Sequence, residues 1–236
     1  MTEALFAADA YARECEATVR SSGPEGVVLD RSVHYPRGGG QPGDAGRLEW
    51  DGGGCAVTDT VKGEGGAILH LIDGTPPPEG AVVRAILDWD RRNRHMRMHT
   101  ALHLLSVAVP LPVTGGQIGA DRSRLDFDMP EPFDKAVIEA DLNALIDADH
   151  PVGETSITEA DLDANPGLVK TLRVAPPRGA GRIRLVRIGG DDGPPVDLQP
   201  CGGTHVRSTG EIGRATVLEV KNKGRSNRRV AISLEP

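Results

Sequence analysis

Two pairs of metal-binding side chains stand far apart in the chain. The first pair is His99 and His103, and the second is Cys201 and His205. A spacing of four places the two imidazoles of the first pair on one face of a helix, where both can reach one ion. One thiolate and three imidazoles suit Zn²⁺, which accepts sulfur and nitrogen ligands at about 2.0 to 2.3 Å. The four residues therefore predict a zinc site.

The local sequence supports this geometry in both segments. Apolar residues recur at helical spacing around the first pair, at Met98, Leu102, Leu105 and Val109. Pro110 then ends the helix. The second pair lies in a loop, because Pro200 precedes it and Gly202-Gly203 stand within it. Such a turn bends Cys201 and His205 toward a common point.

Packed or solvated histidines are the alternative reading of the first pair. His95 extends the same helical stripe one turn earlier, as an outer-shell group, a competing ligand or an exposed residue, and we expect it to be exposed. Cys15, Cys55 and Cys201 are odd in number and widely spaced, which argues against a disulfide framework. A free thiol beside a histidine therefore favours the metal site.

Composition indicates a loop-rich globular protein of two domains. The 236 residues include 30 glycines and 18 prolines, and the net charge of -7 argues against a protein that coats nucleic acid by bulk charge. Neither a secretory signal nor a membrane span is indicated, so we expect a cytoplasmic protein with no membrane partner. Local positive charge is nevertheless concentrated in two runs, Arg91–Arg97 and Lys221–Arg229, which could hold phosphates or form solvated faces.

The pattern of elements predicts an α+β protein. Residues 1–90 read as a small β-barrel or sandwich domain, with short strands broken by Gly and Pro at 16–19, 26–29, 46–50, 55–61, 67–72 and 81–89. Residues 91–236 read as an α+β domain, with helices over 91–109 and 133–149 and strands at 124–128, 183–188, 215–220 and 230–234.

A Gly-dense segment, residues 35–46, interrupts the strands of the first domain. It does not end in Lys-Ser or Lys-Thr, so it is not a Walker phosphate loop. Three adjacent glycines let the backbone approach a ligand closely or adopt positive φ. The segment is either an ordinary tight loop or a functional one.

Five blocks together resemble the freestanding alanyl-tRNA editing proteins, relatives of the editing domain of alanyl-tRNA synthetase. The blocks are Tyr35-Pro36 with Gly38-Gly39-Gly40-Gln41, His99–Leu105, Arg124–Phe127, Cys201–His205 and Lys221–Gly224. The resemblance covers most of the chain and is closest to the medium-length form. It departs at Ser32, where the family commonly has Thr, and at His34, where an aromatic hydrocarbon is usual.

The resemblance implies a β-barrel followed by the editing domain of threonyl- and alanyl-tRNA synthetases. The family's zinc ligands carry over to His99, His103, Cys201 and His205. The implied activity is hydrolysis of the ester that joins a wrong amino acid, serine or glycine, to alanine tRNA, and no protein partner is implied. Because four protein ligands would close a tetrahedral site, we expect the substrate to bind at or beside the metal by a fifth contact or by release of one ligand.

Further candidate residues surround this chemistry. For the substrate we expect the Gly-rich loop to lie over the zinc pocket, with contacts from Ser32, Gly39, Gly40, Gln41 and Gln117. A hydroxyl that pairs with serine's own would reject alanine, although Ser32 and Gln117 could equally cap turns. Asp126 is a weak candidate for a catalytic base, or an ion-pair partner of Arg124. The residues expected to bind tRNA phosphates are Lys221, Lys223, Arg225, Arg228 and Arg229.

Two functions of other classes stay open at this point. The first is a zinc-stabilised RNA-binding module without catalysis. The second is a metal-dependent hydrolase of small esters or amides, which the two basic runs argue against.

Overall fold

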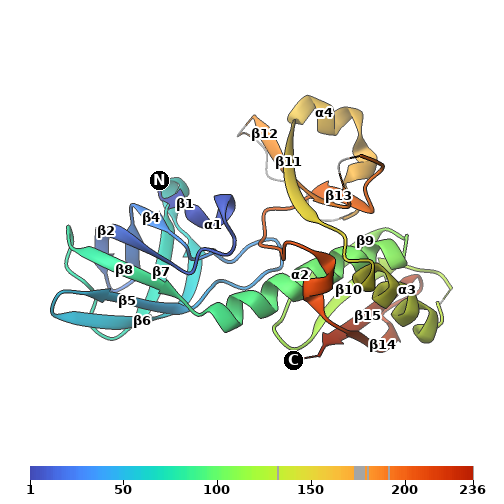
Figure 1. The fold of residues 1–236 in the computed structure, drawn as a ribbon, viewed down its shortest axis with the longest axis horizontal. Coiled ribbons are helices and arrows are strands. Elements are labelled where there is room, and N and C mark those ends of the chain that lie inside the picture. The colour runs from blue at the N-terminus through green and yellow to red at the C-terminus, as the bar shows by residue number, and fades with distance from the viewer. Residues whose placement is uncertain (132, 173–178, 180, 191, 236) are drawn as a thin grey trace. The chain divides into compact units, whose positions relative to one another are not determined.

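The computed structural model describes residues 1–131, 133–172, 179, 181–190 and 192–235. The chain divides into two compact units, Met1–His95 and Met96–Pro236. Strands dominate the first unit, whereas the second contains both strands and helices (Figure 1). The sequence predicts a boundary after residue 90, and the observed division falls after His95, inside helix α2 (Trp89–Ala108).

The first unit is a closed barrel of six strands in the order β2-β3-β7-β6-β5-β8. Neighbouring strands are antiparallel throughout, and closure leaves the barrel without a free edge. Val19, Leu29, Leu48, Val57 and Ala85 belong to its buried core. The strands are β2 (Glu14–Gly23), β3 (Gly26–Leu29), β5 (Gly46–Trp50), β6 (Gly53–Lys62), β7 (Ile68–Asp73) and β8 (Val82–Leu87). Each overlaps one predicted segment, so the predicted barrel is confirmed.

Short elements complete the first unit. Strand β1 (Glu3–Ala4) pairs in parallel with β4 (Arg31–Ser32), and helix α1 (Leu5–Ala8) follows β1 directly. A single turn of 3-10 helix, Glu64–Gly66, joins β6 to β7. The Gly-rich segment lies between β4 and β5, so its ends are held by strands of this unit.

A tight turn forms the tip of the Gly-rich segment. The backbones of Gly38 and Gln41 exchange hydrogen bonds of 2.9 and 3.1 Å, and Gly39 and Gly40 between them have φ of 57° and 85°. A two-residue turn with both φ angles positive is type I′, which residues with a Cβ adopt poorly. Backbone geometry alone therefore accounts for these two glycines.

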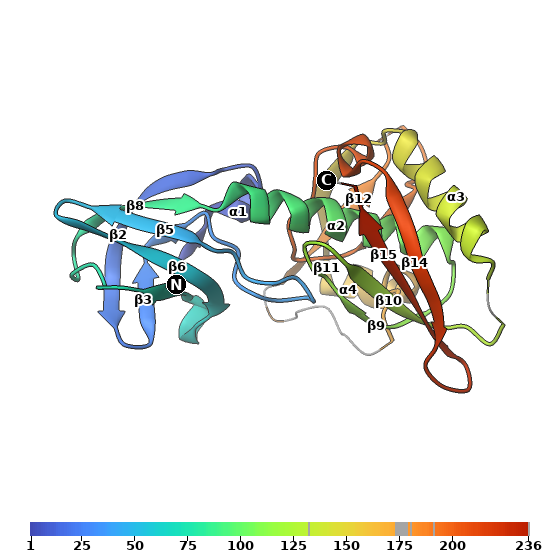
Figure 2. The ribbon, with the colours of Figure 1, turned by 90° about the horizontal axis from the view of Figure 1, so that it is seen from below.

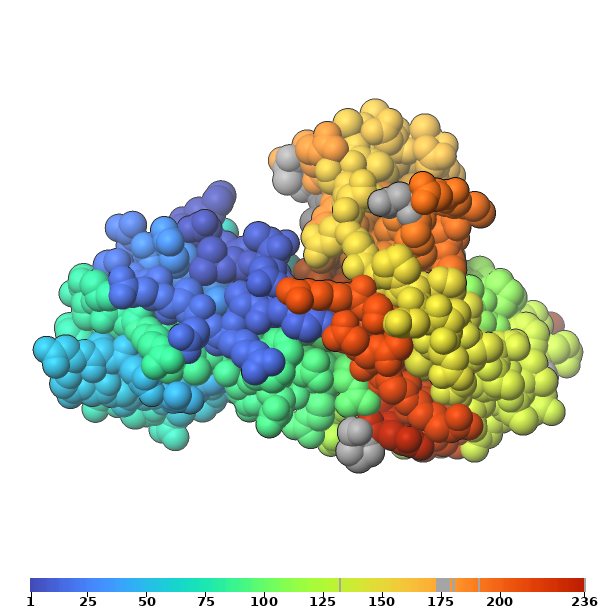
Figure 3. Space-filling view, in the orientation of Figure 1, coloured from blue at the N-terminus to red at the C-terminus, as the bar shows by residue number. Residues whose placement is uncertain are grey.

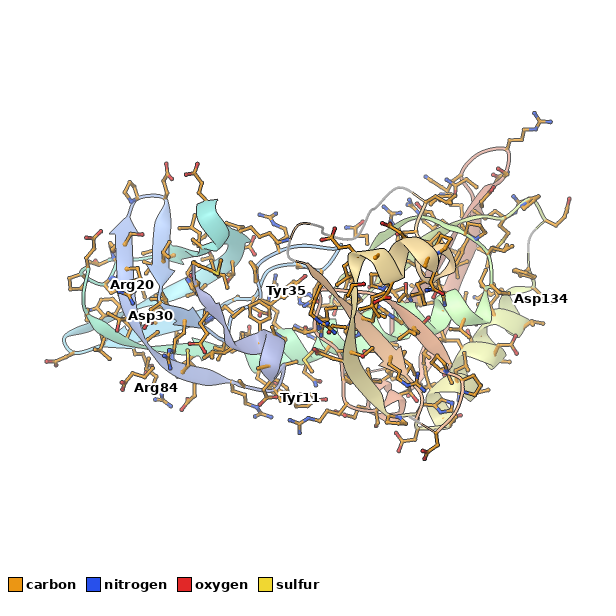
Figure 4. All side chains as sticks on the ribbon, turned by 90° about the horizontal axis from the view of Figure 1, so that it is seen from above. Tyr11, Arg20, Asp30, Tyr35, Arg84 and Asp134 are labelled. Carbon is orange, nitrogen blue, oxygen red and sulfur yellow. The ribbon has the colours of Figure 1, made fainter. Side chains whose placement is uncertain are left out.

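A buried ion pair holds the base of the same segment. The carboxylate of Asp44 accepts a hydrogen bond from the Tyr35 backbone N–H at 2.6 Å and pairs with the guanidinium of Arg92. Arg92 is fully buried and also donates to two backbone carbonyls of the first unit. The hydroxyl of Tyr35, labelled in Figure 4, donates to the Gly38 carbonyl at 2.9 Å. Arg92 is thus a structural residue and is not available to a phosphate.

The second unit contains two antiparallel sheets. The larger has the order β14-β15-β10-β9 and the smaller β11-β12-β13. Strands β14 and β15 form a long hairpin (Figure 2), and residues of β11 and β12 lie together in the space-filling view (Figure 3). The strands are β9 (Val113–Gln117), β10 (Ser123–Asp128), β11 (Val152–Thr158), β12 (Arg182–Ile188), β13 (Asp197–Pro200), β14 (Ala215–Asn222) and β15 (Asn227–Leu234).

Helix α3 (Lys135–Asp147) packs against the larger sheet. The side-chain amide of Asn143 donates to the Ala215 carbonyl at 2.8 Å and accepts from the Ala215 N–H at 2.9 Å. Asp134, labelled in Figure 4, caps the helix by accepting from the Ala136 N–H. Because α2 and α3 match the two predicted helices and the unit also contains two sheets, the predicted α+β class is confirmed.

The sequence reading misses several short elements of the second unit. They are β9, β11 and β13, helix α4 (Glu159–Ala164), and the 3-10 turns Pro166–Leu168 and Thr209–Ile212. Within the described residues, no helix combines the length and the apolar character needed to cross a membrane.

Candidate metal centre

Helix α2 presents His99 and His103 one above the other. Their rings lie 5.3 Å apart between centroids, and both side chains are buried. The helix is buried nearly all round in its second half, since Met98, Ala101 and Leu104 have no exposed surface. A helix in such a position holds its polar side chains in a fixed place, because water does not compete for them.

The loop after β13 presents Cys201 and His205. The guanidinium of Arg184 donates to the Cys201 carbonyl at 2.6 Å and to the Gly203 carbonyl at 3.0 Å. The Gly203 N–H points at the Cys201 sulfur, 3.4 Å away. Arg184 is itself held by Glu154 of the neighbouring strand. The loop is therefore fixed at two carbonyls, and one backbone donor faces the thiol.

The two segments bring four ligand atoms together. The ligand atoms of His99, His103, Cys201 and His205 all lie within 4.8 Å of one another. The Cys201 sulfur is 3.4 Å from Nε2 of His99 and 3.3 Å from Nε2 of His205. A tetrahedral zinc site with ordinary bond lengths has a sulfur-to-nitrogen edge of about 3.5 Å. The donor set and its spacing fit zinc, and the predicted convergence of the two motifs is observed.

The electrostatics of the cluster favour the protonation states of Cys201 and His205 that can bind a metal. Burial raises the pKa of the Cys201 thiol, but the adjacent rings of His99 and His205 outweigh burial and hold it well below its usual range. Burial and the neighbouring His99 lower the pKa of His205 to about 3. A thiolate and a neutral imidazole are the forms that bind a metal.

His103 differs from the other two histidines because a carboxylate supports it. Its Nδ1 lies 2.8 Å from a carboxylate oxygen of Asp197. Burial lowers the pKa of His103, yet the hydrogen bonds and charges of Asp197 and Cys201 outweigh it and raise that pKa to about 9. Burial raises the pKa of Asp197, whereas His103 and Lys170 together lower it to about 2. Metal binding at this ring would therefore release a proton.

Two family models match the chain. The model described as the threonyl and alanyl tRNA synthetase second additional domain matches residues 183–231, which include Cys201 and His205. The model of class II (A) tRNA synthetases matches residues 2–91, the barrel unit and the start of α2. The first match therefore contains the loop that carries half of the cluster.

Whole-chain relatives agree with these matches. The chain is 38% identical over 247 residues to the alanyl-tRNA editing protein AlaX-M of Methanosarcina barkeri, covering 99% of each chain. The chain belongs to the AlaX-M family of alanyl-tRNA editing proteins. It is 34% identical over 243 residues to the AlaX-M protein of Saccharolobus solfataricus, covering both chains completely. It is also 38% identical to the alanine–tRNA ligase of Pyrobaculum arsenaticum over 230 residues. The aligned residues cover 93% of this chain and 25% of that protein.

Two residues beside the cluster were not singled out from the sequence. Thr100 and Asp197 are both buried. The Thr100 hydroxyl contacts Nδ1 of His205, and the Asp197 carboxylate contacts Nδ1 of His103. Thr100 stands inside the His99–His103 block, and Asp197 precedes Cys201 by four residues, two strand repeats earlier. A search for polar residues that share a strand face with a ligand would find Asp197. His95, expected to be exposed, is only 2% exposed, so that expectation is wrong.

The hydroxyl of Ser32 is fully buried in the first unit. It accepts from the His34 N–H at 3.0 Å and lies 2.8 Å from Nε2 of His70. Nδ1 of His70 lies 3.0 Å from the Val27 carbonyl, which only accepts, so Nδ1 carries the hydrogen and Nε2 is an acceptor. Ser32 therefore donates to His70, and among the described residues its second lone pair has no donor. A substrate role for Ser32 stays a prediction, as it does for Gly39 and Gly40, which are exposed, and for Gln41, which is buried.

Asp126 and Gln117 lie on the larger sheet of the second unit. Asp126 accepts two hydrogen bonds from Arg229, at 2.7 and 2.9 Å, and one from Arg124 at 2.6 Å. Burial raises the pKa of Asp126, but these two guanidinium groups outweigh it and lower that pKa. These contacts favour the ion-pair reading of Asp126 over the catalytic base. Gln117 is exposed at the end of β9, opposite Arg124, and its substrate contact stays a prediction.

The predicted tRNA-binding residues fall into two groups. Lys221, Lys223 and Arg225 are exposed near the end of the β14–β15 hairpin. Arg228 donates to the Met129 carbonyl at 3.0 Å, and Arg229 is paired with Asp126. The first group is therefore better placed for phosphates than the second.

Proposed function

We propose that this protein hydrolyses the ester of alanine tRNA that carries serine or glycine, at a zinc centre formed by His99, His103, Cys201 and His205. The observation that carries the proposal is the convergence of these four side chains from two distant segments within 4.8 Å. Membership in the AlaX-M family supports an editing role. An aminoacyl ester is already activated, so hydrolysis needs a positioned water and stabilisation of the developing oxyanion.

The chain's own residues set up the conditions for this chemistry. When bound, zinc polarises an ester carbonyl or lowers the pKa of a water toward about 7. Helix α2 supplies two imidazoles at fixed spacing, and Arg184 fixes the loop that supplies the thiolate and the third imidazole. The low pKa of the Cys201 thiol and of His205 keeps both as ligands near neutral pH.

For amino-acid selection we propose Ser32, supported by Gly39, Gly40, Gln41 and Gln117. The lone pair of Ser32 that receives no donor from the described part of the chain suits a donor, and the hydroxyl of serine is a donor that alanine lacks. Ser32→Ala should therefore lower the kcat/KM for serine-charged tRNA by about tenfold to a hundredfold and that for glycine-charged tRNA less. Equal losses on both substrates would mean that Ser32 only shapes the loop.

For tRNA binding we propose the three exposed residues of the hairpin, Lys221, Lys223 and Arg225. Replacing all three with Ala should weaken tRNA binding and reduce its salt dependence by about one unit of slope per lost phosphate contact. Zinc content should not change. Arg228→Ala serves as the control, because the guanidinium of Arg228 is held by the Met129 carbonyl. This substitution should leave the salt dependence close to that of the wild type.

The decisive experiment compares alanine tRNA charged with serine, glycine and alanine as substrates. We expect deacylation of the first two and sparing of the third, with loss of activity in Cys201→Ala and on chelator treatment. Cys15→Ala is the matched control, since Cys15 lies on β2 of the barrel. Binding of tRNA without hydrolysis would indicate an RNA-binding module, and equal hydrolysis of serine esters that lack tRNA would indicate a small-ester hydrolase.

A further inference from the structure

We propose that Asp197 and Thr100 are positioning residues that make His103 and His205 face the metal with Nε2. This inference rests on the metal centre of the proposed function. An imidazole binds a metal through the nitrogen without a hydrogen, so the partner of the other nitrogen decides which atom is the ligand. Both partners are buried, Thr100 completely and Asp197 at 2% exposure.

Asp197 selects the hydrogen position on His103. The ammonium of Lys170 donates to its Oδ1 at 2.6 Å, and the amide of Gln199 donates to its Oδ2 at 2.7 Å. A carboxyl group that receives both donors is ionised and can only accept. Nδ1 of His103 faces both Oδ2 of Asp197, at 2.8 Å, and the Gln199 amide nitrogen, at 3.1 Å. Because the carboxylate is the closer partner and is charged, and the Gln199 amide already donates to it, Nδ1 carries a hydrogen and the lone pair is left on Nε2.

Thr100, through a neutral hydroxyl, selects the same tautomer in His205, with the hydrogen on Nδ1. Its hydroxyl donates to the Met96 carbonyl at 2.9 Å and so has no hydrogen left for another acceptor. Toward Nδ1 of His205, 3.1 Å away, it can only accept. The lone pair of His205 is then on Nε2, the atom that lies 3.3 Å from the Cys201 sulfur.

The supports of Asp197 connect it back to helix α2. Lys170 also donates to the Ser106 hydroxyl at 3.2 Å, and Ser106 donates to the His103 carbonyl at 2.7 Å. Asp197, Gln199 and Cys201 alternate along β13 and its end, so the strand repeat places the acid and the thiolate on one face. Two donors, Lys170 and Gln199, thus hold the carboxylate while it faces one ring.

The two partners should contribute unequally to metal affinity. An anionic acceptor raises the basicity of an imidazole more than a neutral hydroxyl does, because it stabilises the positive charge that the ring acquires on binding a cation. His103 is therefore the more firmly bound of the two rings. Loss of Asp197 should weaken zinc binding more than loss of Thr100.

The test measures zinc affinity by competition with a chromophoric chelator, on the full chain. Asp197→Asn should bind zinc about 10- to 100-fold more weakly, and Thr100→Val about threefold to tenfold more weakly, each still reaching one ion per chain. Thr100→Ser, which keeps the hydroxyl, should match the wild type. Exposed residues of the same unit supply matched controls, Asp141→Asn and Thr216→Val, with unchanged affinity.

A second measurement reads the tautomers directly. Nitrogen NMR of the zinc-loaded wild type should show a hydrogen on Nδ1 of both His103 and His205. Lys170→Met disturbs the same buried cluster without touching His103, so it should weaken zinc binding less than Asp197→Asn; equal losses would show a packing role and overturn the proposal. Affinities of Asp197→Asn and Thr100→Val within twofold of the wild type, or Nδ1 as the ligand atom, would also overturn it. Absence of zinc from the wild type would instead refute the metal centre itself.

Discussion

Both units bury histidines, yet the two groups differ in what surrounds them. In the barrel, the rings of His34 and His70 lie edge to face, 5.2 Å apart, and both are fully buried. In the second unit, His99, His103 and His205 surround a thiol, and a carboxylate supports one ring. Burial lowers the pKa of both barrel histidines, that of His70 to about 4. Near neutral pH His34 and His70 are uncharged core residues, whereas the histidines of the second unit are placed to bind one cation together with Cys201.

The comparison shows that burial of histidines does not by itself make a metal site. The distinguishing features are a thiolate within 3.4 Å of two ring nitrogens and acceptors that orient the rings. In the barrel, His70 is oriented by the Val27 carbonyl toward Ser32, a hydroxyl that does not bind zinc well. The same residue type therefore serves packing in one unit and forms a candidate metal centre in the other.

The largest effect should come from exchanging one histidine of each group for glutamine. His103→Gln should lower the zinc content from about one ion per chain to near zero, because three ligands remain and the carboxylate loses its ring. His70→Gln should leave zinc content unchanged. Elemental analysis of both purified variants measures this. Zinc loss in His70→Gln, or full retention in His103→Gln, would remove the distinction between the groups.

A smaller effect concerns stability at acid pH. His70 has a pKa of about 4 in the folded protein and 6.5 ordinarily, so the unfolded chain binds the proton more readily. The contribution of a neutral His70 to the free energy of unfolding should therefore be fully present above pH 6.5. It should be lost, by roughly 3 kcal/mol, as the pH drops from 6.5 through 4. His34, whose pKa is also lowered mainly by burial, acts in the same direction.

Denaturant unfolding of zinc-free protein at several pH values tests this effect. The His70→Gln variant lacks the titrating ring, and its amide can donate to Val27 and accept from Ser32. Its unfolding free energy should therefore depend less on pH between 6.5 and 4 than that of the wild type. Parallel curves for the two proteins would show that His70 does not titrate in this window.

The smallest effect should come from His34→Phe. No atom of the described residues meets the geometry of a hydrogen bond to either ring nitrogen of His34, although the side chain is fully buried; the Ile86 backbone is near enough only to offset part of the lowering of its pKa. An apolar ring removes this unpaired polar surface and should stabilise the protein by about 1 kcal/mol. Thermal unfolding of the zinc-loaded protein measures it. A lower midpoint would mean that the space around His34, which is close to Gly46, does not admit a six-membered ring.

Much of the fold and half of the site follow from local sequence. The six barrel strands, helix α2 and helix α3 are visible as periods of two and of 3.6 residues between Gly and Pro breaks, because side-chain direction repeats with backbone geometry. The same rule places His99 and His103 on one helix face. Short elements such as β13 and α4 escape it, since four to six residues carry too little periodicity to separate strand, helix and loop.

The sequence by itself determined which residue types are available to a zinc ion and on which elements two of them stand. Only the tertiary structure decided that Asp197 and Thr100 orient the rings, that Arg92 is paired inside the barrel with Asp44, and that Arg229 neutralises Asp126. Each of these contacts joins residues far apart in the chain, through side chains whose type suits many partners. Chain spacing constrains neighbours within a turn or a strand repeat, whereas long-range pairs are set by how whole elements pack and by the cost of leaving a buried charge unpaired.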